Sequence, residues 1–307
     1  MRISINLCLL MLAIAPAAAA GNIVTVAGSP PASPQRVATL DFVMTEIAVT
    51  LGIDPVGVAR PAGYRQWVGV LDERLDGATD LGLRHEPSLE ALAGTAPDLI
   101  VGTRWRHGAT LDMLRQVAPT LLYHNLPAPE ATDQLTRMRA VVRDLGRRTG
   151  REAEARTALA SLDDRLAATR ERLRNAGLLG TPVVIAQHAP GTTRFHLYSA
   201  NSLGAQLAEA IGLDNTWDGK WGDYGYETVR AESLANLGDS HLLLMVEPGD
   251  EAFANLKQSP VWQELPPVAG DRIHRLPPYT WFFGGPVVAA RLGERFADAL
   301  LDGAAAN

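Results

Sequence analysis

Arg84 is the residue whose type and position best suit ligand binding. It lies in the segment DLGLRHEPS, directly after a predicted strand near residues 78–81 and directly before a predicted helix. Open α/β sheets bind ligands at the carboxyl ends of their strands, and a guanidinium offers a rigid fork of donors that suits oxygen-rich anions or metal-chelate oxygens. The alternative is a purely structural arginine paired with Asp80 or Glu86.

A second cationic segment, RWRH, follows the next predicted strand, at residues 98–102. Trp105 could form a flat apolar wall, with Arg104, Arg106 and His107 as donors beside it. Since this segment also follows a strand, it occupies the same position in the fold as Arg84. The competing interpretation is a loop whose charges are solvated.

Large aromatic residues gather in predicted loops, where a helix core does not explain them. Such clusters, accompanied by a few cations, fit a bulky and partly apolar ligand that carries oxygen groups. The aromatic residues in question are Tyr64, Trp67, Trp217, Trp221, Tyr224, Tyr226, Tyr279, Trp281, Phe282 and Phe283.

The sequence lacks the short motifs of familiar enzymes. It contains no Gly-x-Ser-x-Gly elbow, Walker loop, Gly-x-Gly-x-x-Gly fingerprint or His-Glu-x-x-His helix. The histidines are scattered, and direct metal binding needs histidines and carboxylates that converge. We therefore expect no enzyme activity, no cofactor and no directly bound metal.

One long helix organises the elements that position these residues. Residues 149–177 include no proline, Thr149 and Glu152 have the spacing of a capping box, and Gly177 can end the helix in a left-handed conformation. Apolar residues repeat on one face: Leu159, Leu162, Leu166 and Leu173. We interpret this segment as a connector between two lobes; the alternative is a surface helix of one large α/β domain.

On both sides of this helix, short apolar strands alternate with helices, which predicts an α/β fold. Two short internal repeats favour two similar lobes: TLGIDP recurs as AIGLDN, and SLEALAGTAPDLIVG recurs loosely as RAESLANLGDSHLLLMV. A cleft between two lobes is a common site for a small molecule. Because a helical connector provides no flexible hinge, we expect little closure of the lobes.

The ends and the composition predict an exported protein. Residues 1–20 combine an early Arg2, an apolar run and small residues, as in a cleavable signal peptide. The single cysteine, Cys8, lies inside that segment. Without Arg2, 27 of the 28 basic residues remain against 34 acidic residues, so the charge gives no reason to expect nucleic-acid binding. We expect a soluble monomer.

Several segments together resemble one family along nearly all of the mature chain. They include GLRHEPSLEAL, YRQWV, LDMLRQVAPT, SANSLGAQLAEAIGLDNTW and SPVWQELPPVAGDRIHRLPPYTWFFG. They are similar to the periplasmic ferric-siderophore-binding proteins, and most similar to the ferric-hydroxamate (ferrichrome) binders. The resemblance implies a helical-backbone (class III) protein with lobes at 21–149 and 178–307 and a connecting helix at 150–177. It also implies a periplasmic carrier that delivers a ferric siderophore to an inner-membrane ABC permease.

The resemblance assigns roles to individual residues. Arg84 matches the arginine that contacts hydroxamate oxygens, and three tryptophans match residues in or near the pocket: Trp67, Trp217 and Trp281. The sequence departs from the hydroxamate pattern where Trp105, Arg106 and His107 replace a pocket tyrosine, and where Phe283 replaces another. The segment RHGATLDMLRQVAPT looks more like the ferric-citrate or carboxylate-siderophore binders, and more local cations would favour a more negatively charged chelate.

The same resemblance implies a docking pair and leaves two alternatives. Glu90 and Glu232 match the glutamates, one on each lobe, that such proteins present to arginine pockets of the permease. A cobalamin or haem carrier would use the same scaffold, with His107 or Tyr279 as a haem ligand. A periplasmic siderophore esterase would need a nucleophile and a base, such as Ser199 with His196.

Overall fold

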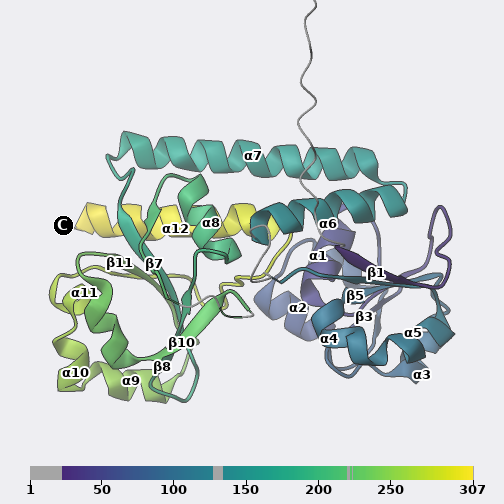
Figure 1. Ribbon diagram of the computed structural model, residues 1–307, viewed down its shortest axis with the longest axis horizontal. Coiled ribbons are helices and arrows are strands. Elements are labelled where there is room, and N and C mark those ends of the chain that lie inside the picture. The colour runs from purple at the N-terminus through teal and green to yellow at the C-terminus, as the bar shows by residue number, and fades with distance from the viewer. Residues whose placement is uncertain (1–22, 127–133, 220–221, 223, 307) are drawn as a thin grey trace, which may run out of the picture.

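Two α/β lobes lie side by side beneath one long helix (Figure 1). The computed structural model describes residues 23–126, 134–219, 222 and 224–306. The predicted signal peptide, residues 1–20, and Trp221 lie outside these residues. No helix among the described residues is long and apolar enough to cross a bilayer.

The N-terminal lobe is built on a six-stranded sheet in the order β1-β6-β5-β2-β3-β4. β1 pairs antiparallel with β6, and the other neighbours pair in parallel. The central strand β5 is buried along its whole length, as expected when helices cover both faces of a parallel sheet. The strands are β1 (Val24–Ala27), β2 (Val37–Thr39), β3 (Gly57–Val58), β4 (Thr79–Asp80), β5 (Leu99–Thr103) and β6 (Thr120–Tyr123).

Short helices connect these strands, and one of them lies where Tyr64 and Trp67 were expected in a loop. The segment after β3 contains a helix that starts with Pro61 in its first turn, where proline is tolerated. RWRH is also helical, and not the loop of the competing interpretation. The elements are α1 (Phe42–Thr50), α2 (Pro61–Trp67), η1 (Asp72–Leu75), α3 (Leu89–Gly94), α4 (Arg104–His107), η2 (Gly108–Thr110) and α5 (Leu111–Val117).

The C-terminal lobe has a mixed sheet in the order β10-β8-β7-β11-β12, with β9 pairing to β7. β7, β11 and β12 are parallel, while β8 is antiparallel to both β7 and β10. The strands are β7 (Pro182–His188), β8 (Arg194–Tyr198), β9 (Asp214–Asn215), β10 (Tyr226–Arg230), β11 (His241–Met245) and β12 (Ile273–Arg275). The helices are α8 (Leu203–Ala210), η3 (Ala231–Leu237), α9 (Glu251–Lys257), α10 (Pro260–Gln263), α11 (Pro266–Ala269) and α12 (Pro286–Ala306).

The long helix is α7 (Glu152–Asn175), and its predicted apolar face is buried. Gly177 has a φ of 73°, so it provides the left-handed stop that the sequence predicts. The predicted capping box is wrong. Thr149 donates its hydroxyl hydrogen bond back to the carbonyl of Leu145, because it closes α6 (Gln134–Arg148), and the cap residue of α7 is Arg151.

A second helix, α12, runs alongside α7 (Figure 1). Arg165 of α7 makes two hydrogen bonds of 2.8 and 2.7 Å to Glu294 of α12. One hydrophobic cluster includes residues of α1, α7, β7 and α12, so the lobes share a core through these helices. The connection is thus a pair of helices, and the predicted limits of the lobes and connector stay a prediction.

Glu46 fastens the start of α12 to the N-terminal lobe. This α1 residue is fully buried, and its carboxylate accepts hydrogen bonds from the backbone N–H groups of Gly285, Val287 (3.1 Å) and Val288 (2.9 Å). These groups are the donors that a helix N-terminus leaves unsatisfied. Burial raises the pKa of Glu46 to about 7, although these hydrogen bonds and Arg291 act to lower it. Glu46 therefore anchors the segment that precedes α12.

Candidate functional site

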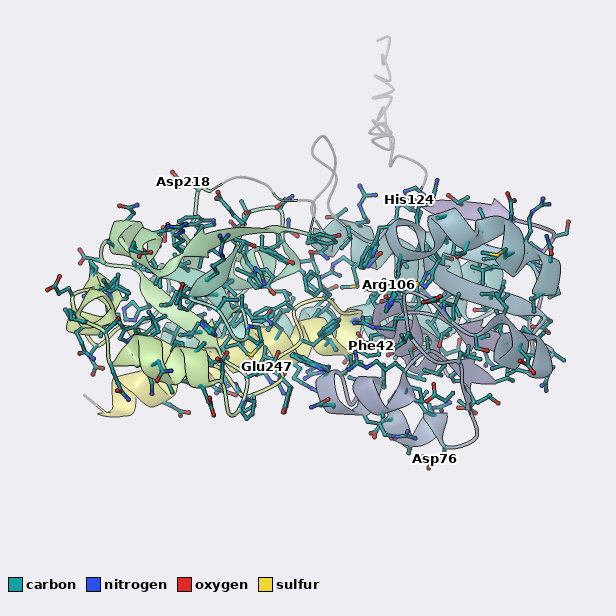
Figure 2. All side chains as sticks on the ribbon, turned by 90° about the horizontal axis from the view of Figure 1, so that it is seen from below. Phe42, Asp76, Arg106, His124, Asp218 and Glu247 are labelled. Atoms are coloured by element: carbon teal, nitrogen blue, oxygen red, sulfur yellow. The ribbon has the colours of Figure 1, made fainter. Side chains whose placement is uncertain are left out.

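Two adjoining cavities lie where the lobes meet. Their volumes are about 470 and 380 Å³, and they share Arg84, Tyr226, Trp281 and Phe283. Figure 2 shows the face opposite α7, with Phe42 and Arg106 on one side of the molecule's middle and Glu247 on the other. The larger cavity is also lined by Phe42, Arg60, Gln66, Trp67, Gln187, His196, Glu247, Tyr279, Thr280 and Phe282. The smaller is also lined by Asp41, Val43, Trp105, Arg106, Asn125, Leu126 and Tyr224.

Arg84 lies between β4 and α3 and reaches into both cavities. Its guanidinium carbon lies 3.9 Å from the ring centre of Phe42 and 5.5 Å from that of Trp281. Its charged partner is Asp41, at 3.8 Å, and not Asp80 or Glu86 as the structural alternative supposed. Burial lowers the pKa of Arg84, Asp41 raises it, and Arg106 and Arg60 lower it further.

Asp41 joins Arg84 and Arg106 to the start of α1. One carboxylate oxygen accepts a 3.0 Å hydrogen bond from Arg106 Nε and faces Arg84, while the other accepts a 3.3 Å bond from the N–H of Val43 as the helix cap. The Arg106 guanidinium also stacks over the ring of Trp105 at 3.9 Å. Arg106 is therefore held in place at the wall of the smaller cavity.

His107 is fully buried and does not line either cavity. Its Nδ1 accepts a 3.0 Å hydrogen bond from the N–H of Thr103, so its Nε2 carries the proton and donates to the carbonyl of Arg84 at 2.7 Å. Burial lowers the pKa of His107. His107 therefore does not make the contact with the ligand that the sequence predicted, and its ring is not placed to bind a haem iron. The side chain fixes the backbone of Arg84.

Aromatic rings from both lobes form the cavity walls. Trp67 contacts the rings of Tyr279 and Trp281 edge to face, with centroids 5.2 and 5.8 Å apart. Trp105, 42% exposed, meets Tyr224 of the other lobe at 5.4 Å. The structure thus brings Trp67, Trp105 and Trp281 together with Arg84, as the sequence predicted.

Other aromatic residues of the predicted clusters lie elsewhere. Trp217 packs against the outer core cluster of the C-terminal lobe and lines neither cavity. Tyr64 is fully buried, and its hydroxyl donates to the carbonyl of Val70 at 2.8 Å. Phe283, expected in the pocket, does line both cavities. Residue type alone did not separate these packing roles from cavity roles.

Several lining residues were missed by the sequence reasoning. Glu247 follows β11 and Arg60 follows β3, so the rule that located Arg84 could have found both. Gln187, the last residue but one of β7, also lines the larger cavity and had no signal in the sequence. Asn125 is 9% exposed, and its side-chain oxygen has no hydrogen-bond partner in the described part of the chain.

The site offers hydrogen-bond donors and aromatic surfaces, which suit binding more than catalysis. Among the described residues, no group of three or more His, Cys, Asp or Glu side chains could hold a metal ion. Ser199 is fully buried, and Nδ1 of His196 lies 2.9 Å from the hydroxyl of Thr228. Burial lowers the pKa of His196, which keeps it neutral at neutral pH.

The predicted docking glutamates lie on separate lobes. Glu90 is exposed in the first turn of α3, and Glu232 is exposed in the first turn of η3. Acidic residues at helix starts also suit the helix dipole. Their position therefore agrees with both interpretations of the pair, and docking stays a prediction.

Two α/β lobes that enclose an aromatic cleft, and are connected by helices rather than by a hinge, define a binding protein for a small ligand. The chain belongs to the Periplasmic binding protein family, whose sequence pattern matches residues 37–280. The family expected from the sequence is thereby confirmed, and with it the conclusion that the chain is a binding protein and not an enzyme.

Individual relatives agree with this assignment. The chain is 28% identical over 263 residues to the iron(3+)-hydroxamate-binding protein FhuD of Escherichia coli, covering 83% of each chain. The structure matches Fe3+–Desferal-bound FhuD from Vibrio cholerae with a TM-score of 0.78 and 25% identity, covering 88% of this chain and 98% of that one. Staphylococcus aureus SirA, complexed with staphyloferrin B, has the same fold, with a TM-score of 0.68 and 23% identity, covering 88% and 94%. The predicted fold class is confirmed.

Proposed function

We propose that this protein captures a ferric siderophore in the cleft between its lobes and delivers it to an ABC importer of the inner membrane. The observation that carries the proposal is the state of Arg84. Its side chain is 17% exposed and lines both cavities, its ion pair with Asp41 is long at 3.8 Å, and no described residue accepts a hydrogen bond from it. The guanidinium donors are therefore available to oxygen atoms of a ligand in the cleft. The oxygens of a chelate would supply the acceptors.

The cavity walls and the relatives support the same proposal. Aromatic rings cover apolar parts of a bulky chelate, and the arginines face its oxygens. The FhuD proteins of Escherichia coli and Vibrio cholerae are named for hydroxamate and siderophore binding. A hydroxamate siderophore is the favoured ligand, and a carboxylate or citrate type is the alternative. Iron would arrive already chelated, so the protein would need no metal ligands of its own.

The test is a titration of intrinsic tryptophan fluorescence with ferrichrome, ferrioxamine and ferric citrate, each beside its iron-free form. Arg84→Ala should weaken binding of the best ferric chelate at least about tenfold, which corresponds to about 1.4 kcal/mol. Arg65→Ala is the matched control, since Arg65 of α2 forms exposed ion pairs with Asp72 and Asp76. It should leave the affinity unchanged.

Two results would count against the proposal. Equal affinity of wild type and Arg84→Ala would remove Arg84 from the site. If no ferric chelate changes the fluorescence, and haem or cobalamin binds instead, the proposed scaffold would stand but the proposed ligand would be wrong.

The remaining features of the proposal concern its setting. The protein would act as a monomer in the periplasm after removal of residues 1–20. Glu90 and Glu232 would dock to the permease, one from each lobe of the predicted 21–149 and 178–307 division. The family name is compatible with this setting.

A further inference from the structure

We propose that Asp41 selects the ligand by charge, so that the cleft accepts a neutral or singly negative chelate and disfavours polyanionic ones. This inference rests on the proposed function, because it names the class of ferric chelate that the same cleft would take.

The first step is the position of Asp41. It is 4% exposed, lines the smaller cavity, and has both oxygens engaged. One oxygen faces Arg84 at 3.8 Å and Arg106 at 3.0 Å, and the other caps α1 through Val43. The helix cap and Arg106 together hold the carboxylate in this orientation. Two arginines and one carboxylate therefore leave a single positive charge at this end of the cleft.

The second step is the charge of the remaining cleft. The larger cavity adds Arg60 and Glu247, whose charges cancel. The nearby histidines add no positive charge at neutral pH, since burial lowers the pKa of both His196 and His107. The lining of the two cavities thus holds three arginines against two carboxylates, a net charge of one positive.

The third step is the cost of mismatch. The arginines are partly buried against Phe42, Trp281 and Trp105, so charges placed beside them are poorly screened by water. One negative charge on a ligand would be balanced by the net charge of the cleft. Each additional one would be desolvated without a partner and would also face Asp41, which costs binding energy.

This charge balance changes the interpretation of the RWRH segment. A count of the cationic residues in RWRH, made from the sequence alone, favours a more negatively charged chelate. In the structure, His107 serves the backbone of Arg84, Arg106 is paired with Asp41, and Arg104 lines neither cavity. The surplus of cations seen in the sequence does not reach the ligand site.

The test uses one chelate core with different terminal charges: ferrioxamine B, which is singly positive, its neutral N-acetyl derivative and its singly negative N-succinyl derivative. A triply negative ferric tris-catecholate, ferric enterobactin, provides the extreme. Each is titrated by tryptophan fluorescence against wild type and Asp41→Asn, which keeps the shape and the helix cap but removes the charge. Asp163→Asn, an exposed position on α7 paired with Arg139, makes the same charge change away from the cleft.

We expect wild type to bind the neutral and singly negative forms more tightly than the triply negative one. Asp41→Asn should raise the affinity for the N-succinyl form relative to the N-acetyl form by about fivefold or more, with a larger gain for ferric enterobactin. It should also make these ratios more sensitive to salt. Asp163→Asn should change neither ratio.

A loss of affinity by the same factor for every ligand would show that Asp41 only shapes the site, and would overturn the inference. So would an unchanged ranking of the ligands, or an equal shift with Asp163→Asn. In each of these cases ferric chelates still bind, and the proposed function stands. Binding of no ferric chelate by wild type would refute the proposed function, and this inference with it.

Discussion

Replacing Glu46 by glutamine should change how the stability of the protein depends on pH. Glu46 is fully buried, and burial raises its pKa from 4.5 to about 7 in the folded protein. An acid with a raised folded-state pKa holds its proton at pH values where the unfolded chain has lost it. Its contribution to stability is therefore fully present below about pH 4.5 and is lost as the pH rises through about 7.

The size of the effect follows from the shift in pKa. A difference of about 2.5 units between 4.5 and about 7 corresponds to about 3 kcal/mol in the free energy of unfolding. Between about pH 5 and about pH 8, wild type should lose about 2.5 kcal/mol relative to Glu46→Gln. Glutamine has one acceptor oxygen for the donors at Gly285, Val287 and Val288, so the variant carries a penalty. That penalty does not vary with pH.

The assay is urea unfolding of both proteins, without ligand, at several pH values from about 5 to 8. The quantity of interest is the wild-type free energy of unfolding minus that of Glu46→Gln. The exposed residue Glu90, replaced in the same way, is the control for the loss of one carboxylate at the surface. If the Glu46 difference stays constant across this range, the carboxylate is ionised throughout. The three backbone N–H groups would then outweigh its burial.

Three further results are expected. Glu90→Ala combined with Glu232→Ala should leave ligand affinity unchanged but severely reduce uptake in cells, and wild-type transport by the double variant would refute docking through this pair. Trp105→Ala should weaken ligand binding by several-fold because it removes an aromatic wall that contacts Tyr224, while Trp105→Phe should retain most of the affinity. Equal titration curves for wild type and both variants would exclude Trp105 from the site. His188→Ala should lower the free energy of unfolding by about 3 kcal/mol, because it empties the space of a fully buried ring that packs against Phe195 and Phe253 and removes the hydrogen bond of 2.8 Å to Asp250. A loss below about 1 kcal/mol in urea unfolding would contradict this.

Local patterns in the sequence were enough to predict the long helix and the position of Arg84 after a strand. The leucines of α7 repeat at helical spacing, Gly177 stops the helix, and Arg84 follows a strand at the edge where ligands bind. These features depend on residues that are near one another in the chain. The starts of helices were less predictable, because Thr149 can serve either the helix before it or the helix after it.

Contacts between distant residues could not be predicted in this way. Asp41 meets Arg106, 65 positions away, and Glu46 meets Gly285, 239 positions away. His107 turns toward the backbone of Arg84 only because α4 and the β4–α3 connection are packed together. Such pairings set the charge of the cleft and the anchoring of its wall, so residue types alone gave a site that was too cationic.

The helices that hold the lobes and the residues that line the cleft are separate sets. None of the residues that line the two cavities belongs to α7 or α12. Substitutions in the cleft can therefore alter which cargo is held while the spacing of the lobes stays constant. For evolution, this means that residues lining the cleft can change without any change in the sequences of α7 and α12. For engineering, it means that the cleft can be randomised as a library on a frame that does not need to be redesigned.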